Sequence, residues 1–351
     1  MDLKTAIKKN NSKKVEELID NNKTVEEKIQ FINTPINSSQ DTPLNIAAMF
    51  NNIDIVKLLV KAGAELDIAN DDDETPLHTA VHRGNIKIVK FLIDRGANIN
   101  TRDSIDRYTP LHLALSCPGE IEDKSTMKYL NIANLLIESG ANLEATTPRR
   151  NNTPLHKLIE TSIRISIDDG YRGMENSELY KAALEIVKLL IKKQVNINAA
   201  DNNGNTPLHR ALRNNDFELA YILMKAGADT TIKNNNGKIP LQIIETEDSI
   251  EDDDGSEGLT RFEEFLKKKR VNDKYAKKLT QYVRNHATAN ITKKVDKISK
   301  GKLPSELGEE VAKYLVGRRH SRNKPGKKTR HIRNKPGKKT RHSRDKRRKK
   351  L

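Results

Sequence analysis

The stretch Thr75-Pro76-Leu77-His78 decides how this chain folds, because it recurs along most of its length. Proline fits the first turn of a helix, where its missing N–H costs nothing, and Ala80 and Val81 continue the apolar stripe that Leu77 begins. Gly84 then interrupts the helix, and a second apolar segment follows at 86–93. Each copy therefore predicts two antiparallel helices. The other full copies are Thr109-Pro110-Leu111-His112, Thr153-Pro154-Leu155-His156 and Thr206-Pro207-Leu208-His209, and the weaker ones are Thr42-Pro43-Leu44-Asn45 and Ile239-Pro240-Leu241-Gln242.

The spacing of the copies points to a repeat architecture. Successive copies lie 33, 34, 44, 53 and 33 residues apart. A signature of this kind with a period of about 33 residues resembles the ankyrin repeat, whose unit is a turn and two antiparallel helices. The resemblance implies an all-α ankyrin-repeat solenoid with β-hairpin loops between its units. It also implies a monomer that binds a target protein on its concave face.

Segments that depart from the repeat pattern surround and interrupt the array. Terminal units with a more polar outer face are expected of a solenoid, and insertions are expected to emerge at one of its edges. The predicted segments are N-terminal capping helices at 1–37, five repeats at 38–235 with insertions near 116–125 and 163–180, a degenerate C-terminal repeat or cap with an acidic loop at 236–270, a helical region at 271–317 and a disordered basic tail at 318–351.

The net charge of +16 is concentrated at one end of the chain. Residues 318–351 hold 18 lysines and arginines against one acidic residue, Asp345, so the rest of the chain is close to neutral. The single cysteine, Cys117, excludes an intrachain disulfide framework and a cysteine zinc site. Residues 1–9 lack the apolar segment of a secretory signal, and no apolar run approaches the ~18 residues that span a bilayer. We therefore expect a soluble protein with no membrane partner.

The histidines are the natural place to look for catalysis or metal binding. Four of the nine close the repeat motif, where we expect their side chains to bond to turn backbone. His78 and His82 lie four residues apart, but no third ligand accompanies them. An acidic run at 247–254 fails as a calcium loop, because Ile250 and Arg261 would occupy ligand positions. Phosphate-binding, hydrolase and kinase motifs are absent, so we expect no enzyme, no metal and no cofactor.

A second motif lies after the array, at 302–315. Pro304 marks a helix start, and Leu307, Val311, Tyr314 and Leu315 share one apolar face. The stretch resembles the opening of an F-box, and more specifically the shortened F-box-like (PRANC) element at the C-termini of ankyrin proteins from poxviruses and obligate intracellular bacteria. In that family the helix binds the Skp adaptor of a cullin–RING ubiquitin ligase, while the array holds the target.

The F-box-like resemblance implies a set of adaptor contacts, with one departure from the family's pattern. A full F-box continues into further helices, whereas basic residues follow Gly317 directly. The alternative interpretation is an ordinary amphipathic helix that closes the solenoid. The implied adaptor contacts are Leu303, Pro304, Leu307, Val311 and Leu315.

The basic tail is itself a repeat with a period of 11 residues. Two full copies, 319–329 and 330–340, precede a degenerate third at 341–351, and apolar residues are almost absent, which predicts disorder. Its last cluster fits a nuclear-import signal that importin would bind, and the whole tail fits non-specific nucleic-acid binding. A neutral product of replication slippage is the third interpretation. The import cluster is Lys346, Arg347, Arg348, Lys349 and Lys350.

Taken together, these patterns predict a protein–protein interaction module. The resemblance implies an effector that enters a host cell by a route other than the general secretory one and acts in its cytoplasm or nucleus, where it is a ubiquitin ligase adaptor for its target. Two alternatives stay open. One is a plain ankyrin scaffold without ligase recruitment, and the other is a nuclear protein that binds polyanions through its tail.

Overall fold

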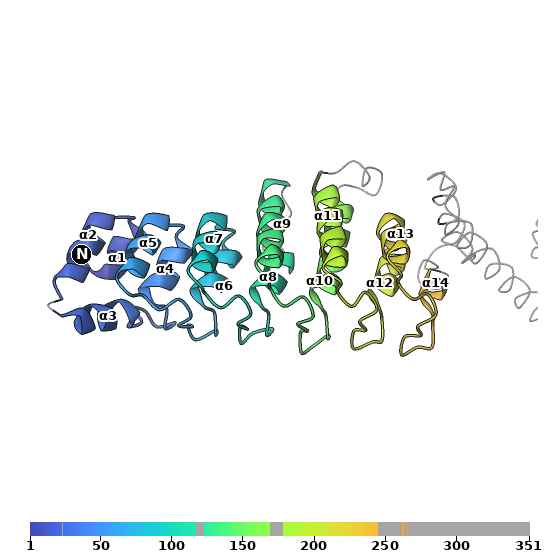
Figure 1. Cartoon of the computed structure of the whole chain (residues 1–351), viewed down its shortest axis with the longest axis horizontal. Helices are drawn as coiled ribbons and strands as arrows, with labels where there is room; N and C mark the ends of the chain where they lie inside the picture. Colours follow the sequence, from blue (N-terminus) through green and yellow to red (C-terminus); the bar gives the residue numbers. More distant parts are fainter. Residues whose placement is uncertain (23, 117–122, 169–177, 245–261, 263–264, 266–351) are drawn as a thin grey trace, which may run out of the picture. The chain divides into compact units, whose positions relative to one another are not determined.

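The computed structural model describes residues 1–22, 24–116, 123–168, 178–244, 262 and 265. They all belong to the first of two compact units, Met1–Ala287, the second being Thr288–Leu351. Within the first unit, helices stand in pairs in a row (Figure 1). Among the helices described, none combines the length and apolar character that a membrane crossing requires.

Each helix pair follows directly from the repeat motif. In one pair, α6 (Pro76–His82) begins after the N-cap Thr75, and Gly84, with a φ of 70°, makes the turn into α7 (Ile86–Asp94). A positive φ is readily available to glycine, which explains the break at this point. The other pairs are α4 (Pro43–Met49) and α5 (Ile53–Lys61), α8 (Pro110–Ser116) and α9 (Asp123–Glu138), α10 (Pro154–Asp168) and α11 (Glu178–Lys192), and α12 (Pro207–Arg213) and α13 (Phe217–Lys225).

The pairs stack so that each buries the apolar face of the next. The first helices α4, α6, α8, α10, α12 and α14 (Pro240–Ile243) pack in sequence, and so do the second helices α5, α7, α9 and α11. Leu77, Leu111 and Leu208, the motif leucines of three units, are completely buried. The motif leucine therefore supplies the core of a continuous stack, as the period predicts.

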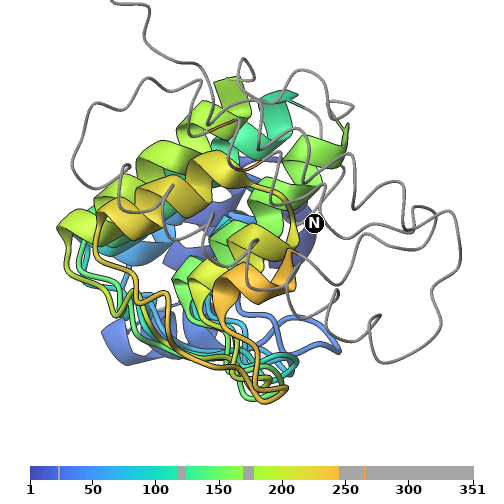
Figure 2. The same cartoon turned by 90° about the vertical axis from the view of Figure 1, so that its right-hand side faces the viewer.

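The loops between units contain no strand within the described part of the chain, although the repeat resemblance implies β-hairpins. Each loop is a tight turn, and Figure 2 shows successive loops in nearly the same place below the first helices. In the loop before α6, one backbone bond joins Asn70 N to Glu74 O (3.1 Å), while Asn70 Oδ1 accepts the amides of Asp72 and Glu74 (both 3.0 Å). Because an asparagine side chain takes these amides, no ladder forms.

The N-terminal cap contains one helix more than the sequence predicted. Helices α1 (Leu3–Lys8) and α2 (Ser12–Asp20) form the expected pair and pack on α4 and α5. A third helix, α3 (Val25–Asn33), follows, and Thr24 and Glu27 form a reciprocal capping box at its start. The spacing Thr-x-x-Glu is the sequence signal that would have revealed α3.

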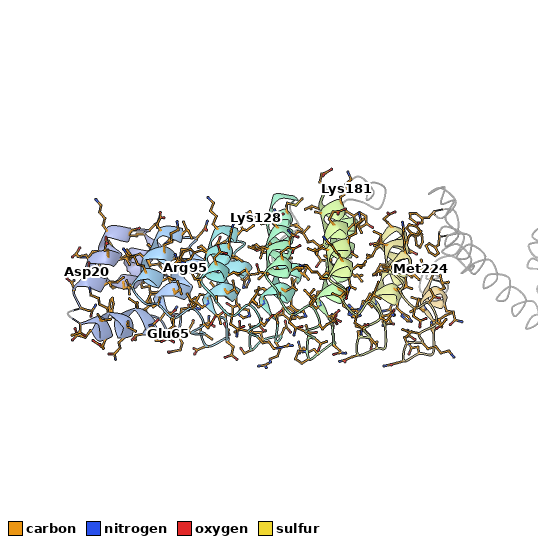
Figure 3. All side chains as sticks on the ribbon, in the orientation of Figure 1. Asp20, Glu65, Arg95, Lys128, Lys181 and Met224 are labelled. Carbon is orange, nitrogen blue, oxygen red and sulfur yellow. The ribbon has the colours of Figure 1, made fainter. Side chains whose placement is uncertain are left out.

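The two predicted insertions partly lengthen helices. Among the first helices, α10 has 15 residues, whereas α4 and α6 have 7. Among the second helices, α9 and α11 have 16 and 15 residues, whereas α5 has 9. The long helices rise beyond their neighbours on the edge away from the loops, where Lys128 and Lys181 lie (Figures 1 and 3). The rest of the inserted sequence, 117–122 with Cys117 and 169–177, lies outside the described residues.

An aromatic cluster lies at the last described unit. Phe262 is completely buried, and its ring centroid lies 5.0 Å from that of Phe217 in α13. Phe265 lies 6.1 Å from the same ring. These contacts place Phe262 and Phe265 against α13. The acidic run 247–254, the helical region 271–317 and the basic tail 318–351 lie outside the described residues.

Candidate functional site

The repeat motif builds a hydrogen-bonded cap at the start of each first helix. Thr75 Oγ1 accepts the amide of His78 (3.4 Å), and His78 Nδ1 accepts in turn from the Thr75 hydroxyl (2.9 Å). Threonine is a favoured N-cap residue, and the reciprocal bonds satisfy amides that the helix cannot. Thr109, Thr153 and Thr206 pair with the histidine of their own unit in the same way.

The other ring nitrogen of each motif histidine joins its unit to the next. A carbonyl can only accept, so Nε2 carries the proton and Nδ1 is unprotonated. The bonds run from His78 Nε2 to Tyr108 O (3.3 Å), from His112 to Asn152 O (3.2 Å), from His156 to Asn205 O (3.2 Å) and from His209 to Lys238 O (3.1 Å).

Burial keeps these histidines neutral. Desolvation lowers the pKa of His112 and of His156 to about 4, and it lowers the pKa of His78 and of His209 in the same direction. A ring with both nitrogens engaged and no charge at neutral pH is not free to exchange protons with a substrate. The motif histidines therefore act as connectors between units.

The first unit makes the same connection without a histidine. Asn45 Oδ1 accepts from the Thr42 hydroxyl (2.5 Å), and Asn45 Nδ2 donates to Glu74 O (3.1 Å). Outside the motif, His82 has Glu74 as its neighbour, with 3.5 Å between Nδ1 and Oε1. His78 and His82 thus contact different partners, and the described residues contain no group of three potential metal ligands.

Further links between successive units involve the second helices, and sequence reasoning missed them. Asn85 Nδ2 donates to Ala48 O (2.7 Å), and the Tyr129 hydroxyl donates to His82 O (2.8 Å). Asp216, the N-cap of α13, accepts from the Tyr180 hydroxyl instead. For α7 and α13, the polar residue just after the interhelix turn, Asn85 or Asp216, was the available signal.

The loops also bond to one another and form one surface, which we call the loop face: the inter-unit loops together with the first helices beside them. Its backbone contacts run from Asp71 N to Ser39 O (3.1 Å), from Ser104 N to Asp72 O (2.9 Å), from Asn202 N to Arg150 O (3.0 Å) and from Asn235 N to Asn203 O (3.0 Å). Side chains strengthen it, since Arg210 bridges Asp201 (2.7 Å) and Asn152 (2.6 Å). Burial alone would raise the pKa of Asp201, but the Arg210 guanidinium holds it below its usual value.

The structure shows where the motif residues lie, whereas the other predicted sites fall outside the described residues. Every motif threonine in 42–209 lies next to a helix start on the loop face. The predicted adaptor contacts in 303–315 and the import cluster in 346–350 lie outside the described residues.

Comparison with known protein families identifies the type of repeat. The model of multiple ankyrin repeats matches residues 3–60, 46–93 and 179–224, and the single ankyrin-repeat model matches 106–148. Together these matches span about half of the chain. They include the N-terminal helices α1 and α2, which lack the Thr-Pro-Leu opening.

The curated relatives include bacterial, viral and eukaryotic proteins. A putative ankyrin repeat protein of Rickettsia bellii is 41% identical over 98 residues, which are 27% of this chain and 55% of that protein. A putative ankyrin repeat protein of Fowlpox virus is 27% identical over 200 residues, 52% of this chain and 46% of the viral one. The chain thus spans about half the length of these curated relatives.

A solved structure resembles the array. The ankyrin repeat domain of Bcl-3, a member of the IkappaB protein family, aligns with a TM-score of 0.55 and 23% identity over 69% of this chain and 93% of that domain. At this identity the likeness concerns the fold. The motif, the stacked helix pairs and the family matches agree, and the chain belongs to the ankyrin-repeat proteins.

Proposed function

We propose that this protein binds a target protein on its loop face and brings it to a Skp–cullin ubiquitin ligase. Binding of a target is supported by the loop face, where hydrogen bonds join one unit to the next. A surface held in this way needs little ordering when a partner binds, which lowers the entropic cost of association. Ankyrin-repeat domains are protein–protein interaction modules, and the neutral, fully engaged histidines favour this role over catalysis.

The second half of the proposal rests on the sequence after the array. The helix predicted at 303–315 presents one apolar face, as a helix that docks in a groove requires. Ankyrin proteins of Rickettsia and of Fowlpox virus are among the relatives, in keeping with the PRANC-type resemblance. In this proposal the array selects the target and the helix recruits the adaptor.

A pull-down with the purified Skp adaptor tests recruitment. The full chain should retain the adaptor, and the variant Leu303→Ala/Pro304→Ala should lose most of it, because both residues belong to the proposed contact. The matched control is Glu309→Ala/Glu310→Ala, which changes the polar side of the same helix and should retain the adaptor. Equal recovery by the wild type and the Leu303/Pro304 variant, or no recovery by either, excludes ligase recruitment.

A further inference from the structure

We infer that the loops of the third and fourth repeats bind an acidic segment of the partner protein that carries an apolar side chain. The inference rests on the proposed function, since it specifies the chemistry of the target that the array holds. It concerns a surface that we call the basic rim, made of Ile105, Arg107, Arg149 and Arg150.

The side chains of the basic rim are open to solvent. Arg149 and Arg150 have 85% and 69% of their side chains exposed, and Arg107 is exposed as well. Beside them, Ile105 is 68% exposed, a large fraction for an apolar residue in a folded array. Exposed guanidinium groups around an apolar side chain suit a segment with carboxylates around an apolar anchor.

The backbone that carries the rim is held by its neighbours. The Arg102 guanidinium donates to Arg107 O (2.9 Å) and to Thr146 O (2.8 Å), so one side chain joins the two loops. Asn202 of the next unit donates from Nδ2 to Arg149 O (2.8 Å) and from its amide to Arg150 O (3.0 Å). The positions from which the guanidinium groups project are therefore fixed before any partner arrives.

The charges around the rim leave a positive excess. Arg149 has Asp106 at 3.9 Å, and Arg150 has Glu160 at 3.3 Å. Glu160 is shared, because Lys157 Nζ lies 3.2 Å from its other oxygen. In the described part of the chain no carboxylate lies within ion-pair distance of Arg107. Since exposed pairs of this kind are weak, carboxylates of a partner compete for these cations at little cost.

The backbone conformation at position 107 does not require an arginine. Its φ is 55°, a left-handed conformation that side chains other than glycine rarely adopt. The corresponding positions of the last two loops are Gly204 and Gly237, both with a φ of 72°, and glycine would fit at 107 equally well. Gln40 and Asn151 adopt the same conformation at this position in their own loops, so the backbone accepts several side chains there and does not itself select arginine.

The second repeat provides a natural contrast. Its loop exposes Asp71, Asp72 and Asp73, and Asp73 occupies the same left-handed position, with a φ of 55°. An acidic segment would be repelled from this loop and attracted to the basic rim. This difference in charge between the loops favours binding of the segment at the third and fourth units over the second.

A protein segment fits the rim better than a nucleic acid does. Unspecific binding of single strands depends on aromatic rings on which bases can stack. The aromatic ring beside the rim, Tyr108, is already occupied, with Lys157 Nζ 5.1 Å from its centroid and the His112 ring stacked at 5.9 Å. Ile105 offers an apolar contact that a phosphate backbone cannot use.

Photo-crosslinking of the full chain tests the inference. The probe is a synthetic 12-residue peptide of glutamates with a central photo-leucine, and crosslinked sites are mapped by mass spectrometry. We expect crosslinks in the loops 102–108 and 147–152, and about a tenfold lower yield there in the variant Arg107→Gly/Arg149→Ala/Arg150→Ala. The control Asp73→Gly should not lower the yield. Because the three arginines are exposed and Arg107→Gly relieves a left-handed residue, the thermal midpoint of the triple variant should not fall, which separates lost binding from lost folding.

Three results overturn the inference. They are an unchanged yield at the two loops in the triple variant, crosslinks confined to the tail 318–351, and displacement of the peptide from the loops by a 12-nucleotide single-stranded DNA at equal concentration. The last result would assign the rim to nucleic acids. None of these outcomes involves the ligase adaptor, so failure of this inference is distinguishable from failure of the proposed recruitment.

Discussion

Acidification should weaken the array through its motif histidines. His112 and His156 are buried and neutral, with each ring bonded to its own threonine and to the next unit. Their pKa falls from the ordinary value of 6.5 to about 4. A lowered pKa in the folded state means that its stabilising contribution is complete above pH 6.5 and is lost as the pH falls towards 4, because the unfolded chain takes up protons first.

The size of this effect follows from the two pKa values. Between pH 7.5 and pH 5.0, each histidine should reduce the free energy of unfolding by about 2 kcal/mol, or about 4 kcal/mol for the pair. Asp216 acts in the opposite direction, because burial raises its pKa to about 6 and protonation favours the folded state. Its contribution is the same in any variant that retains it, so a comparison between variants isolates the histidines.

The chain itself supplies the variant for this comparison. Asn45 makes both bonds of the motif histidine without a group that titrates, so His112→Asn/His156→Asn should keep the connection between units. Urea unfolding followed by circular dichroism at pH 7.5 and pH 5.0 gives the loss of stability in each protein. The variant should lose about 4 kcal/mol less than the wild type over this range. Equal losses in the wild type and the double variant would show that His112 and His156 do not cause the loss of stability in acid.

Three further predictions concern a loop, a helix cap and the tail. An alanine in place of Gly204 puts Cβ 2.8 Å from Asn235 N, whereas Gly237 at the same φ has nothing within 4 Å, so in thermal melts Gly204→Ala should cost about 1–3 kcal/mol more than Gly237→Ala. Asp216→Asn should raise the melting temperature at pH 7.5, because the buried carboxylate is charged above its pKa of about 6, and the gain should vanish below pH 4. Deletion of 318–351 should abolish retention on heparin at low salt, as measured by the salt needed for elution.

The sequence was sufficient to predict the repeated unit because its signals are local. A proline after a threonine, an apolar stripe at helical spacing and a glycine at the turn each act within one unit, as Thr75 and Gly84 illustrate. Their recurrence then implies stacking, which the structure confirms. For the motif histidines, the sequence predicted only a bond to turn backbone. It did not identify the accepting carbonyl, because that carbonyl belongs to the unit that follows.

Features that depend on two units at once could not be predicted. Arg102 joins two loops that lie 44 residues apart in sequence, and nothing local marks it as a bridge. The shift of Asp216 follows from burial and from Tyr180, which reaches it from the preceding helix pair. The helix α3 has a local signal, the capping box that begins at Thr24, but it lacks the Thr-Pro-Leu opening of the repeat unit.

Partner proteins should bind the loop face, and site-specific photo-crosslinking in cells that express the protein detects this contact. A photo-reactive residue replaces Ile105 on the loop face in one protein and Lys181, at the opposite edge of the array, in another (Figure 3). Both side chains are exposed, so either position can report a neighbour. We predict a crosslinked partner protein from position 105 and none from position 181. Crosslinks from position 181 alone would show that partners bind the opposite edge of the array.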